Sequence, residues 1–273
     1  MSYRLNTHIS SDIDVPSYEK RLSICLRPNG FSFSVATSQY LLEFGQALHE
    51  GAADMVSLSN DIKALFQSLG IQPFAFQKVE LVVPSDMSTW VPDELYAEDH
   101  KALYLNLLYG SAPLGSMVYV DPSAELQSRQ LFVAESGIVT AFKIALPGIV
   151  VRSQFSKFSE SDLLDSPSPA ILMYVRSGMV DIQVSHAGKM LMSTSFDFAT
   201  SADLLSIGVD VMQQLQIETP STILWLAGEV GRDIYKALCD YFPQVRLYTG
   251  RKRQFGNPEF QHLHTYQFVL NLI

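Results

Sequence analysis

The stretch from Ala170 to Gly231 constrains the fold more than any other, because its pattern changes from strand to helix and back without interruption. It opens with two apolar runs, 170–176 and 179–185, that flank the dipeptide Ser177-Gly178. A Ser-Gly pair accepts the positive φ angles that a two-residue hairpin turn requires. The stretch is therefore predicted to begin with a β-hairpin.

A third strand, a helix and a buried strand are predicted to follow this hairpin. Residues 189–196 continue as a strand, and apolar residues then recur at helical spacing behind Thr200 or Ser201 as the N-cap. The run 222–227 is apolar and too short for a typical helix, which suits a strand covered on both faces. After the glycine turn 228–231 a second helix begins. Three antiparallel strands thus lead into a helix and a central parallel strand.

The same order of elements is predicted in the first half of the chain. Its hairpin turns at Asn29-Gly30, and Asn-Gly is the strongest short-range hairpin signal in a sequence. Gly30 and Gly178 lie a little over half the chain apart, so a duplicated domain is the economical interpretation. The elements expected in this half are the strands 21–27, 31–35, 40–44 and 77–83 and the helix 54–69.

The remaining segments divide the chain into an arm and two domains. Residues 1–20 are polar and mixed and are expected to form an N-terminal arm. The linker-like segment 165–169 contains two prolines and is expected to separate a first domain, 21–165, from a second, 170–273. The other expected elements are helices over 92–108 and 136–146, strands over 114–120, 130–135 and 244–248, and a final helix from Pro258 through Leu270.

Composition and charge narrow the class of protein. The chain has 273 residues, of which 47% are hydrophobic, so it can bury two cores of ordinary domain size. Its formal net charge of -9 argues against general nucleic-acid binding and against an anionic membrane surface. No apolar run approaches the length of a membrane span, and no targeting segment is visible. Cys25 and Cys239 are expected to be buried, reduced thiols of a cytoplasmic protein.

Signals for enzymatic or metal chemistry are absent from the sequence. It contains no Gly-x-Ser-x-Gly nucleophile elbow, no Gly-x-x-x-x-Gly-Lys-Ser/Thr phosphate loop and no His-Glu-x-x-His zinc motif. His262 and His264 are two positions apart, so they would face different sides of a helix. We therefore predict no catalytic residue and no metal site.

Two tandem units of β-β-β-α-β-α type resemble the duplicated actin-like (ribonuclease H-like) ATPase fold, an α/β architecture. Actin, sugar kinases, heat-shock chaperone ATPases and the bacterial assembly proteins FtsA and PilM share this fold. The likeness covers the chain from Arg21 onward, and residues 22–35 resemble the opening of a family of bacterial proteins of that fold with no assigned function. The resemblance implies two domains with a nucleotide cleft between them.

Each phosphate loop of this superfamily places an aspartate at the end of the first strand, followed by glycines and Thr or Ser. The aspartates orient Mg²⁺, and the small residues let backbone amides reach the phosphates. In this chain Tyr174 and Leu26 stand at the two aspartate positions, and Arg176 stands at a glycine position. Asp181 has a counterpart in the family, but its strand position favours a solvated or hairpin-stabilising role.

Leu226-Ala227-Gly228 resembles the turn that accepts adenosine at a helix start, although a tight strand-to-helix turn also needs glycine for steric reasons. The resemblance therefore implies a degenerate nucleotide cleft without a cofactor. The residues expected to line it are Arg27, Asn29, Gly30, Arg176, Ser177, Gly178, Ala227 and Gly228.

Two functions remain open. The substitutions favour a non-catalytic pseudo-ATPase that acts on an unknown protein partner or forms a homo-oligomer. The alternative is an ATP-binding enzyme or nucleotide switch in which Arg27 and Arg176 replace the metal. For the first function, the expected contact surface is the second hairpin with Met190 and Met192, residues 179–192, or the end of the final helix.

Overall fold

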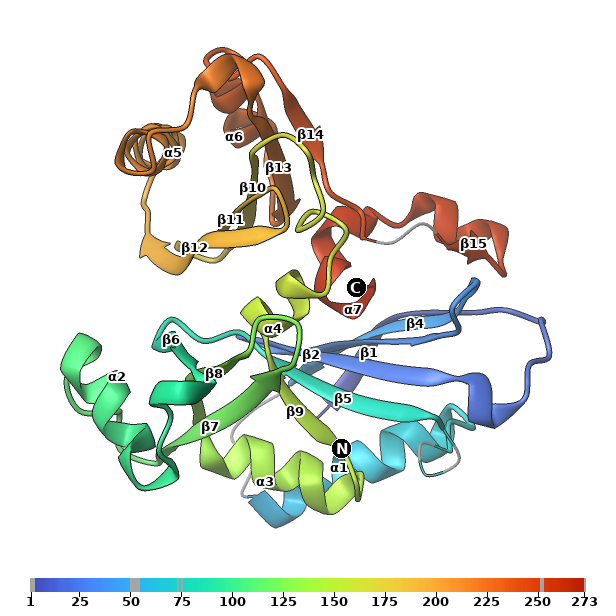
Figure 1. Ribbon diagram of the computed structural model, residues 1–273. Coiled ribbons are helices and arrows are strands. Elements are labelled where there is room, and N and C mark those ends of the chain that lie inside the picture. Colours follow the sequence, from blue (N-terminus) through green and yellow to red (C-terminus); the bar gives the residue numbers. More distant parts are fainter. Residues whose placement is uncertain (1–2, 50–54, 73, 75, 251–252, 273) are drawn as a thin grey trace. The chain divides into compact units, whose positions relative to one another are not determined.

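The computed structural model of the protein describes residues 3–49, 55–72, 74, 76–250 and 253–272. These residues form two compact units, whose helices and strands are labelled in Figure 1. Unit 1 contains the described residues of 1–154, 252–263 and 270–272, and unit 2 contains those of 155–251 and 264–269. The chain therefore enters unit 2 at Phe155 rather than at the linker expected over 165–169.

Seven strands form the main sheet of unit 1: β1 (Tyr3–Ser10), β2 (Arg21–Arg27), β3 (Gly30–Ala36), β4 (Tyr40–His49), β5 (Lys78–Val83), β9 (Val150–Ser153) and β15 (Gln254–Phe255). Their order is β1-β4-β3-β2-β5-β9, and β15 pairs with β4 outside this path. The strands β2, β3 and β4 are antiparallel, whereas β5 is parallel to β2 and β9 is parallel to β5. The predicted hairpin, third strand and parallel strand of the first half are confirmed.

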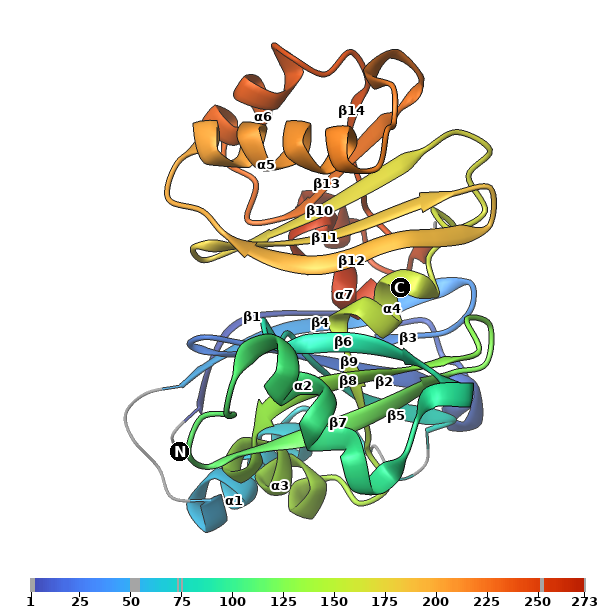
Figure 2. The ribbon, with the colours of Figure 1, turned by 60° about the vertical axis from the view of Figure 1, so that its left-hand side comes forward.

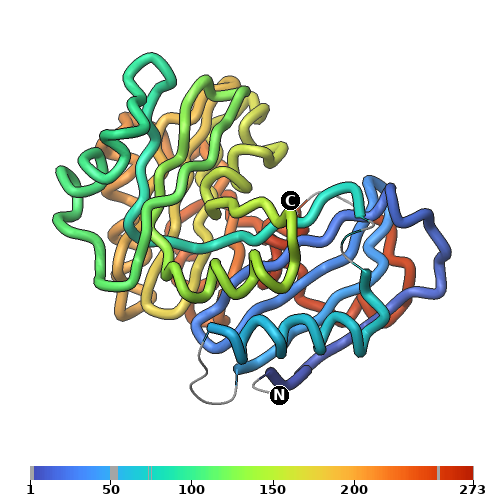
Figure 3. The backbone as a smooth tube through the Cα atoms, turned by 90° about the horizontal axis from the view of Figure 1, so that it is seen from below, coloured from blue at the N-terminus to red at the C-terminus, as the bar shows by residue number. Residues whose placement is uncertain are grey.

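Helices α1 (Met55–Ser68) and α3 (Ser136–Ala145) lie side by side against this sheet (Figure 3). Residue 54, where the first helix was expected to begin, lies outside the described residues. The core between sheet and helices is aromatic: the ring of Phe31 is 6.1 Å from that of Phe66 and 5.3 Å from that of Phe142, between centroids. Aromatic pairs at these separations add about 0.5–1.5 kcal/mol beyond the area they bury.

Unit 1 also contains a smaller sheet of three strands and one helix. These elements are β6 (Ser88–Pro92), β7 (Ser116–Ser123), β8 (Ser128–Glu135) and α2 (Lys101–Tyr109), with the strand order β6-β8-β7. Leu105 of α2 packs with Val91, Leu131 and Val133 in a small core. The helix predicted over 92–108 is shorter in the structure, because two 3-10 turns precede it.

Five strands form the sheet of unit 2: β10 (Ala170–Arg176), β11 (Met179–His186), β12 (Lys189–Asp197), β13 (Ile223–Gly228) and β14 (Val245–Leu247). The order β12-β11-β10-β13-β14 repeats that of β4-β3-β2-β5-β9 in unit 1. Antiparallel pairing joins the first three strands, and β13 is parallel to β10. Every strand predicted between residues 170 and 228 is confirmed.

Helices α5 (Ser201–Gln214) and α6 (Arg232–Cys239) lie on one side of the unit 2 sheet, as Figure 2 shows. Thr200 is the N-cap of α5, and its hydroxyl accepts a hydrogen bond of 3.2 Å from the backbone of Asp203. The Asp203 carboxylate in turn accepts one of 2.8 Å from the backbone of Thr200. This capping box selects Thr200 between the two predicted N-caps. The short helix α4 (Gln154–Ser159) lies where the chain passes from unit 1 to unit 2.

The N-terminal segment differs from the arm expected over 1–20. Its strand β1 pairs antiparallel with β4, and the Tyr3 ring meets Phe31 edge to face at 4.9 Å between centroids. The edge of β4 offers unpaired backbone groups, and Tyr3 adds apolar area to the core, so the segment is ordered despite its polar composition.

The C-terminal segment differs from the helix expected between Pro258 and Leu270. Leu263 has extended backbone angles, which end one 3-10 helix (Pro258–His262) before a second (Thr265–Phe268) and the short helix α7 (Val269–Leu272). Residues 253–263 and 270–272 belong to unit 1, so the expected second domain of 170–273 is too long. Buried Asn271 explains the return to unit 1, since it bonds to β2 and β3.

Candidate functional site

The β10–β11 turn contains a closed ion pair where the resemblance implies a phosphate loop. Arg176 donates from Nε to Oδ2 of Asp181 and from Nη2 to Oδ1, each at 2.8 Å. The Asp181 side chain is fully buried, and it also accepts a hydrogen bond of 2.6 Å from Ser195 Oγ. Of the two roles expected for Asp181, the solvated one is therefore wrong. The two side chains instead fasten the hairpin by a bidentate, charge-assisted pair.

Tyr174 is the residue that the resemblance sets at the aspartate position of the superfamily. Its side chain is buried, and its ring lies 5.6 Å from that of Phe158, between centroids. In the sheet Tyr174 is opposite Asp181 on one side and Ala227 on the other. A carboxylate at residue 174 would lie beside that of Asp181 in a buried setting, which like charges disfavour.

Gly228 closes the sheet end beside this turn. Its φ is +85°, and a Cβ added there would lie 2.0 Å from the carbonyl oxygen of Val175. The next residue, Glu229, donates its backbone N–H to that same oxygen at 2.7 Å. The close approach of two backbones thus requires glycine without reference to a ligand. Ala227 is fully buried in the same strand.

The first hairpin turn, in unit 1, requires glycine for the same steric reason. Gly30 has a φ of +142°, and an added Cβ would lie 2.1 Å from the carbonyl oxygen of Ala47. Asn29 accepts a hydrogen bond of 2.9 Å at its carbonyl from His49. The eight predicted site residues therefore form two groups: Arg27, Asn29 and Gly30 in unit 1, and Arg176, Ser177, Gly178, Ala227 and Gly228 in unit 2.

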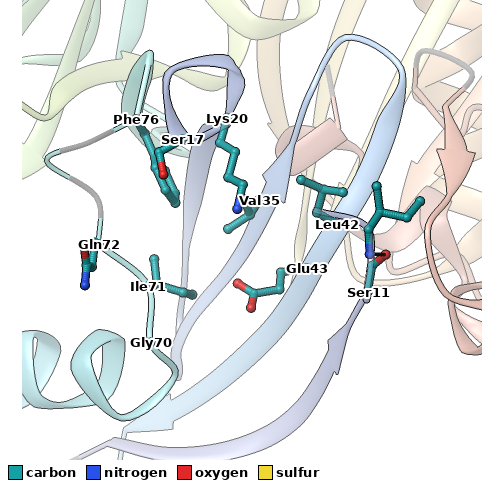
Figure 4. A pocket seen from close by; sticks show the side chains of 11 residues that line it. Ser11, Ser17, Lys20, Val35, Leu42, Glu43, Gly70, Ile71, Gln72 and Phe76 are labelled. Carbon is teal, nitrogen blue, oxygen red and sulfur yellow. Dashed lines mark hydrogen bonds between the residues drawn. The ribbon is translucent and has the colours of Figure 1, made fainter. Parts of the chain in front are cut away.

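A polar pocket in unit 1 is a feature that sequence reasoning missed (Figure 4). Its volume is about 150 Å³, and Lys20 and Glu43 point into it. Its polar lining also includes Ser11, Ser17 and Gln72. Glu43 interrupts the apolar residues 41–44 of strand β4, and a carboxylate in an apolar run is the sequence signal that points to it. The pocket has room for a few waters or a very small ligand.

Burial changes the proton affinity of the groups at this pocket. It raises the pKa of Glu43 to about 7, although the positive charge of Lys20 opposes the shift. His8 Nε2 lies 4.0 Å from Glu43 Oε1, and burial lowers the pKa of this imidazole. Glu43 therefore exchanges a proton near neutral pH, whereas His8 is neutral there.

A second group of buried charges joins three strands of unit 1. Arg152 of β9 donates from Nε to both carboxylate oxygens of Asp121 at 2.8 Å, and from Nη1 to Glu80 at 2.8 Å. Lys78 lies 2.7 Å from Glu80, and the backbone N–H of Ser153 donates to Asp121 at 3.1 Å. Two cations thus balance two carboxylates, and their ion pairs join β5, β7 and β9.

The surfaces expected for partner binding are only partly available. Leu191 on β12 is exposed, but Met192 packs against the unit 2 core. At the end of the chain, Leu270, Asn271 and Leu272 are all buried, so the end of the final helix is not a contact surface. This part of the expectation is wrong because the side chains 270–272 of α7 are buried in the fold.

Three further observations concern metals, membranes and thiols. Among the described residues, no group of three or more His, Cys, Asp or Glu side chains is arranged to hold a metal ion. None of the helices in the described part of the chain is long and apolar enough to cross a membrane. Cys25 and Cys239 are both free thiols, but Cys239 is exposed on α6 instead of buried as expected.

Comparisons with known proteins identify the family and the fold. A family model described as "Protein of unknown function (DUF3822)" matches residues 11–245. A Bacteroides thetaiotaomicron protein with actin-like ATPase fold and unknown function superposes with a TM-score of 0.66 at 20% identity, covering 85% of this chain and 91% of that one. A chain of the PilM-PilN type IV pilus biogenesis complex superposes with a TM-score of 0.56 at 12% identity, covering 94% and 97%. No curated protein matches the sequence. The chain has the two-domain actin-like ATPase fold.

Proposed function

The chain belongs to the DUF3822 family of proteins of unknown function, and we propose that it is a non-catalytic actin-like protein that acts by binding a partner. The observation that carries this proposal is the Arg176–Asp181 pair in the β10–β11 turn. By the resemblance, this turn corresponds to the place where an active member of the fold would hold a metal and phosphates. The pair supports a degenerate nucleotide site, because its carboxylate is already neutralised.

Energetics favour this proposal over a phosphate site built on arginine. A phosphate could engage Arg176 only if the guanidinium left Asp181, whose side chain is fully buried. Removing one partner from a buried ion pair costs about 3–5 kcal/mol. A hydrogen bond to a charged group returns about 1.5–3 kcal/mol. The exchange is therefore unfavourable unless other groups at the turn bind the phosphate strongly.

A protein-binding role is supported by a similar chain that is part of a protein complex. One similar chain comes from a complex of PilM with PilN, in which a protein of this fold contacts another protein. The free thiols Cys25 and Cys239 fit a reducing compartment, and we place the protein in the cytoplasm. Identifying the partner would therefore identify the process that the protein serves.

Thermal unfolding in the presence of nucleotide tests the proposal. A ligand at a hundred times its Kd stabilises a protein by about 2.7 kcal/mol, which raises the Tm by several degrees in a chain of this size. We expect no change in Tm with millimolar Mg-ATP, Mg-ADP or ATP with EDTA, and no ATP hydrolysis above the buffer rate. A rise in Tm with ATP, with or without Mg²⁺, would overturn the proposal in favour of the nucleotide switch, and a switch built on Arg27 and Arg176 would keep that rise in EDTA.

A further inference from the structure

Helix α2 exposes leucine side chains that nothing in unit 1 covers. Leu103 is 51% exposed and Leu107 is 75% exposed, whereas Leu105 between them is buried. Residues four apart on a helix lie on one face, and Leu105 lies on the opposite one. Leu108 adds a further side chain that is 62% exposed. A helix that is apolar on all sides is normally buried, so the outer face of α2 is the kind of surface that a partner covers.

The segment before α2 carries a further exposed leucine and is held against the helix. Leu95 is 69% exposed, and its carbonyl accepts a hydrogen bond of 2.5 Å from the Tyr104 hydroxyl on α2. The rings of Tyr96 and Tyr104 stack at 6.5 Å between centroids, which fixes the segment against the helix. We call Leu95, Leu103, Leu107 and Leu108 the α2 patch.

Acidic side chains accompany the α2 patch. Asp93 pairs with Arg129 and Glu98 pairs with Lys101, but Glu94 and Asp99 are exposed and form no ion pair among the described residues. The four carboxylates of residues 93–99 thus face two cations, Lys101 and Arg129. Glu94 and Asp99 leave this segment with a net negative charge.

We propose that the α2 patch binds an amphipathic helix of a partner protein, with an apolar stripe flanked by Lys and Arg. The proposal rests on the partner-binding function given above and names the chemistry of that partner. A helix fits because Leu103 and Leu107 repeat every turn, and such rows interdigitate with apolar residues at i, i+3, i+4 and i+7 of another helix.

Charge disfavours two other occupants. A second copy of the chain would bring its own Glu94 and Asp99 against those of the first, and each chain has a formal net charge of -9. An anionic membrane would meet the same repulsion, whereas a cationic helix gains from the field. Apolar contacts supply affinity in this arrangement, and the acidic side chains select the sign of the partner's charge.

A designed peptide tests the proposal with the full chain. The probe is a fluorescein-labelled helix of about 18 residues, or five turns, with a Leu stripe and Lys at the other positions. Fluorescence anisotropy is expected to show saturable binding that weakens as salt is added. The same peptide with Glu in place of Lys is expected to bind roughly tenfold more weakly or not at all.

Two test variants, each compared with a control variant in unit 2, locate the contact. Leu103→Asp/Leu107→Asp is expected to weaken binding of the Lys peptide by roughly tenfold or more, whereas Leu191→Asp on β12 leaves it unchanged. Glu94→Lys/Asp99→Lys is expected to weaken it roughly threefold to tenfold. The control with the same change in net charge is Asp210→Lys/Glu218→Lys, at two exposed carboxylates of unit 2. Circular dichroism must show each variant to be folded.

Several outcomes would overturn the assignment: no binding, equal binding of the Lys and Glu peptides, or an equal loss in the variants and their controls. Binding to vesicles of anionic lipid that Leu103→Asp/Leu107→Asp abolishes would assign the patch to a membrane instead. These failures leave the non-catalytic function standing. A rise in Tm with ATP, with or without Mg²⁺, overturns that function whatever the peptide does.

Discussion

The side chain of Asp181 shows how one residue decides the chemistry of a turn. It is fully buried, and Arg176 supplies the cation that balances it, with one-fifth of the Arg176 side chain exposed. Replacing the arginine leaves a buried carboxylate without its counter-ion, which is among the costlier single changes in a protein.

We expect Arg176→Gln to lower the free energy of unfolding by about 3 kcal/mol, the lower end of the range for buried pairs, because Arg176 is partly exposed. Urea denaturation at pH 7 measures the loss. The control is Arg246→Gln, where the guanidinium lies 5.6 Å from the Trp225 ring and contributes no more than about 1 kcal/mol. Equal losses in the two variants would show that the Arg176–Asp181 pair contributes no more to the free energy of unfolding than Arg246 does.

Glu43 makes the stability of unit 1 depend on pH. Burial raises its pKa to about 7 in the folded protein, above its ordinary value of 4.5. Between pH 4.5 and pH 7, the Glu43 carboxyl group is therefore largely protonated in the folded state and largely ionised in the unfolded state. This contribution to stability is complete below about pH 4.5 and is lost as pH rises through 7.

We expect Glu43→Gln to remove this dependence, because an amide does not titrate. The variant should be more stable than the wild type at pH 8 by up to about 3 kcal/mol, and close to it at pH 5. Urea denaturation at both pH values measures the difference, with exposed Glu19→Gln as the control. His8 and Lys20, which face Glu43, are unchanged in both variants. A gain of the same size at pH 5 would rule out the buried proton as the cause.

At the scale of an element, the turn after β13 depends on how closely two strands approach. Gly228 and Gly188 both have positive φ angles, but an added Cβ meets the Val175 carbonyl only at residue 228. Both alanine variants carry the cost of left-handed backbone, about 1–2 kcal/mol.

We expect Gly228→Ala to lose clearly more stability than Gly188→Ala, because only Gly228→Ala must also separate β10 from β13. Thermal unfolding of the two variants, compared with the wild type, measures the difference. If both alanine variants lost the same amount, the packing explanation for Gly228 would fail, and its resemblance to an adenosine-binding turn would regain weight.

At the scale of the whole molecule, the C-terminal segment completes unit 1 after the chain has built unit 2. Asn271 is buried and accepts a hydrogen bond of 2.7 Å from Ser32, while its amide donates at 3.0 Å to the carbonyl of Ser23. Ser34 donates to the Asn271 carbonyl at 2.8 Å. Residues more than 230 positions apart are thereby joined.

We expect Asn271→Ala to destabilise unit 1 by about 2–3 kcal/mol, because the change leaves buried polar groups on β2 and β3 without partners. Hydrogen exchange of the amides of β2 and β3 measures the effect locally. Gln261→Ala, an exposed change in the same C-terminal region, is the control. Unchanged protection of those amides would mean that the segment only rests on the sheet.

The sequence by itself determined the order of elements, because its signals are local. The Ser177-Gly178 and Asn29-Gly30 turns, the capping residue Thr200 and the apolar run before Gly228 each specify structure within a few residues. These signals predict a duplicated α/β protein, and the resemblance to a known family added the actin-like ATPase fold. Places where the local signal was weak were missed, among them β1 and the broken C-terminal segment.

Only the tertiary structure decided which side chains meet. The sequence indicated Arg176 as a residue of the candidate site. It did not indicate that Arg176 pairs with Asp181, because strand register sets that pairing. The Glu43 pocket, the Arg152 network and the place of Asn271 depend on segments far apart in the chain. A pKa or an ion pair follows from burial and distance, and neither quantity exists until the sheets have formed.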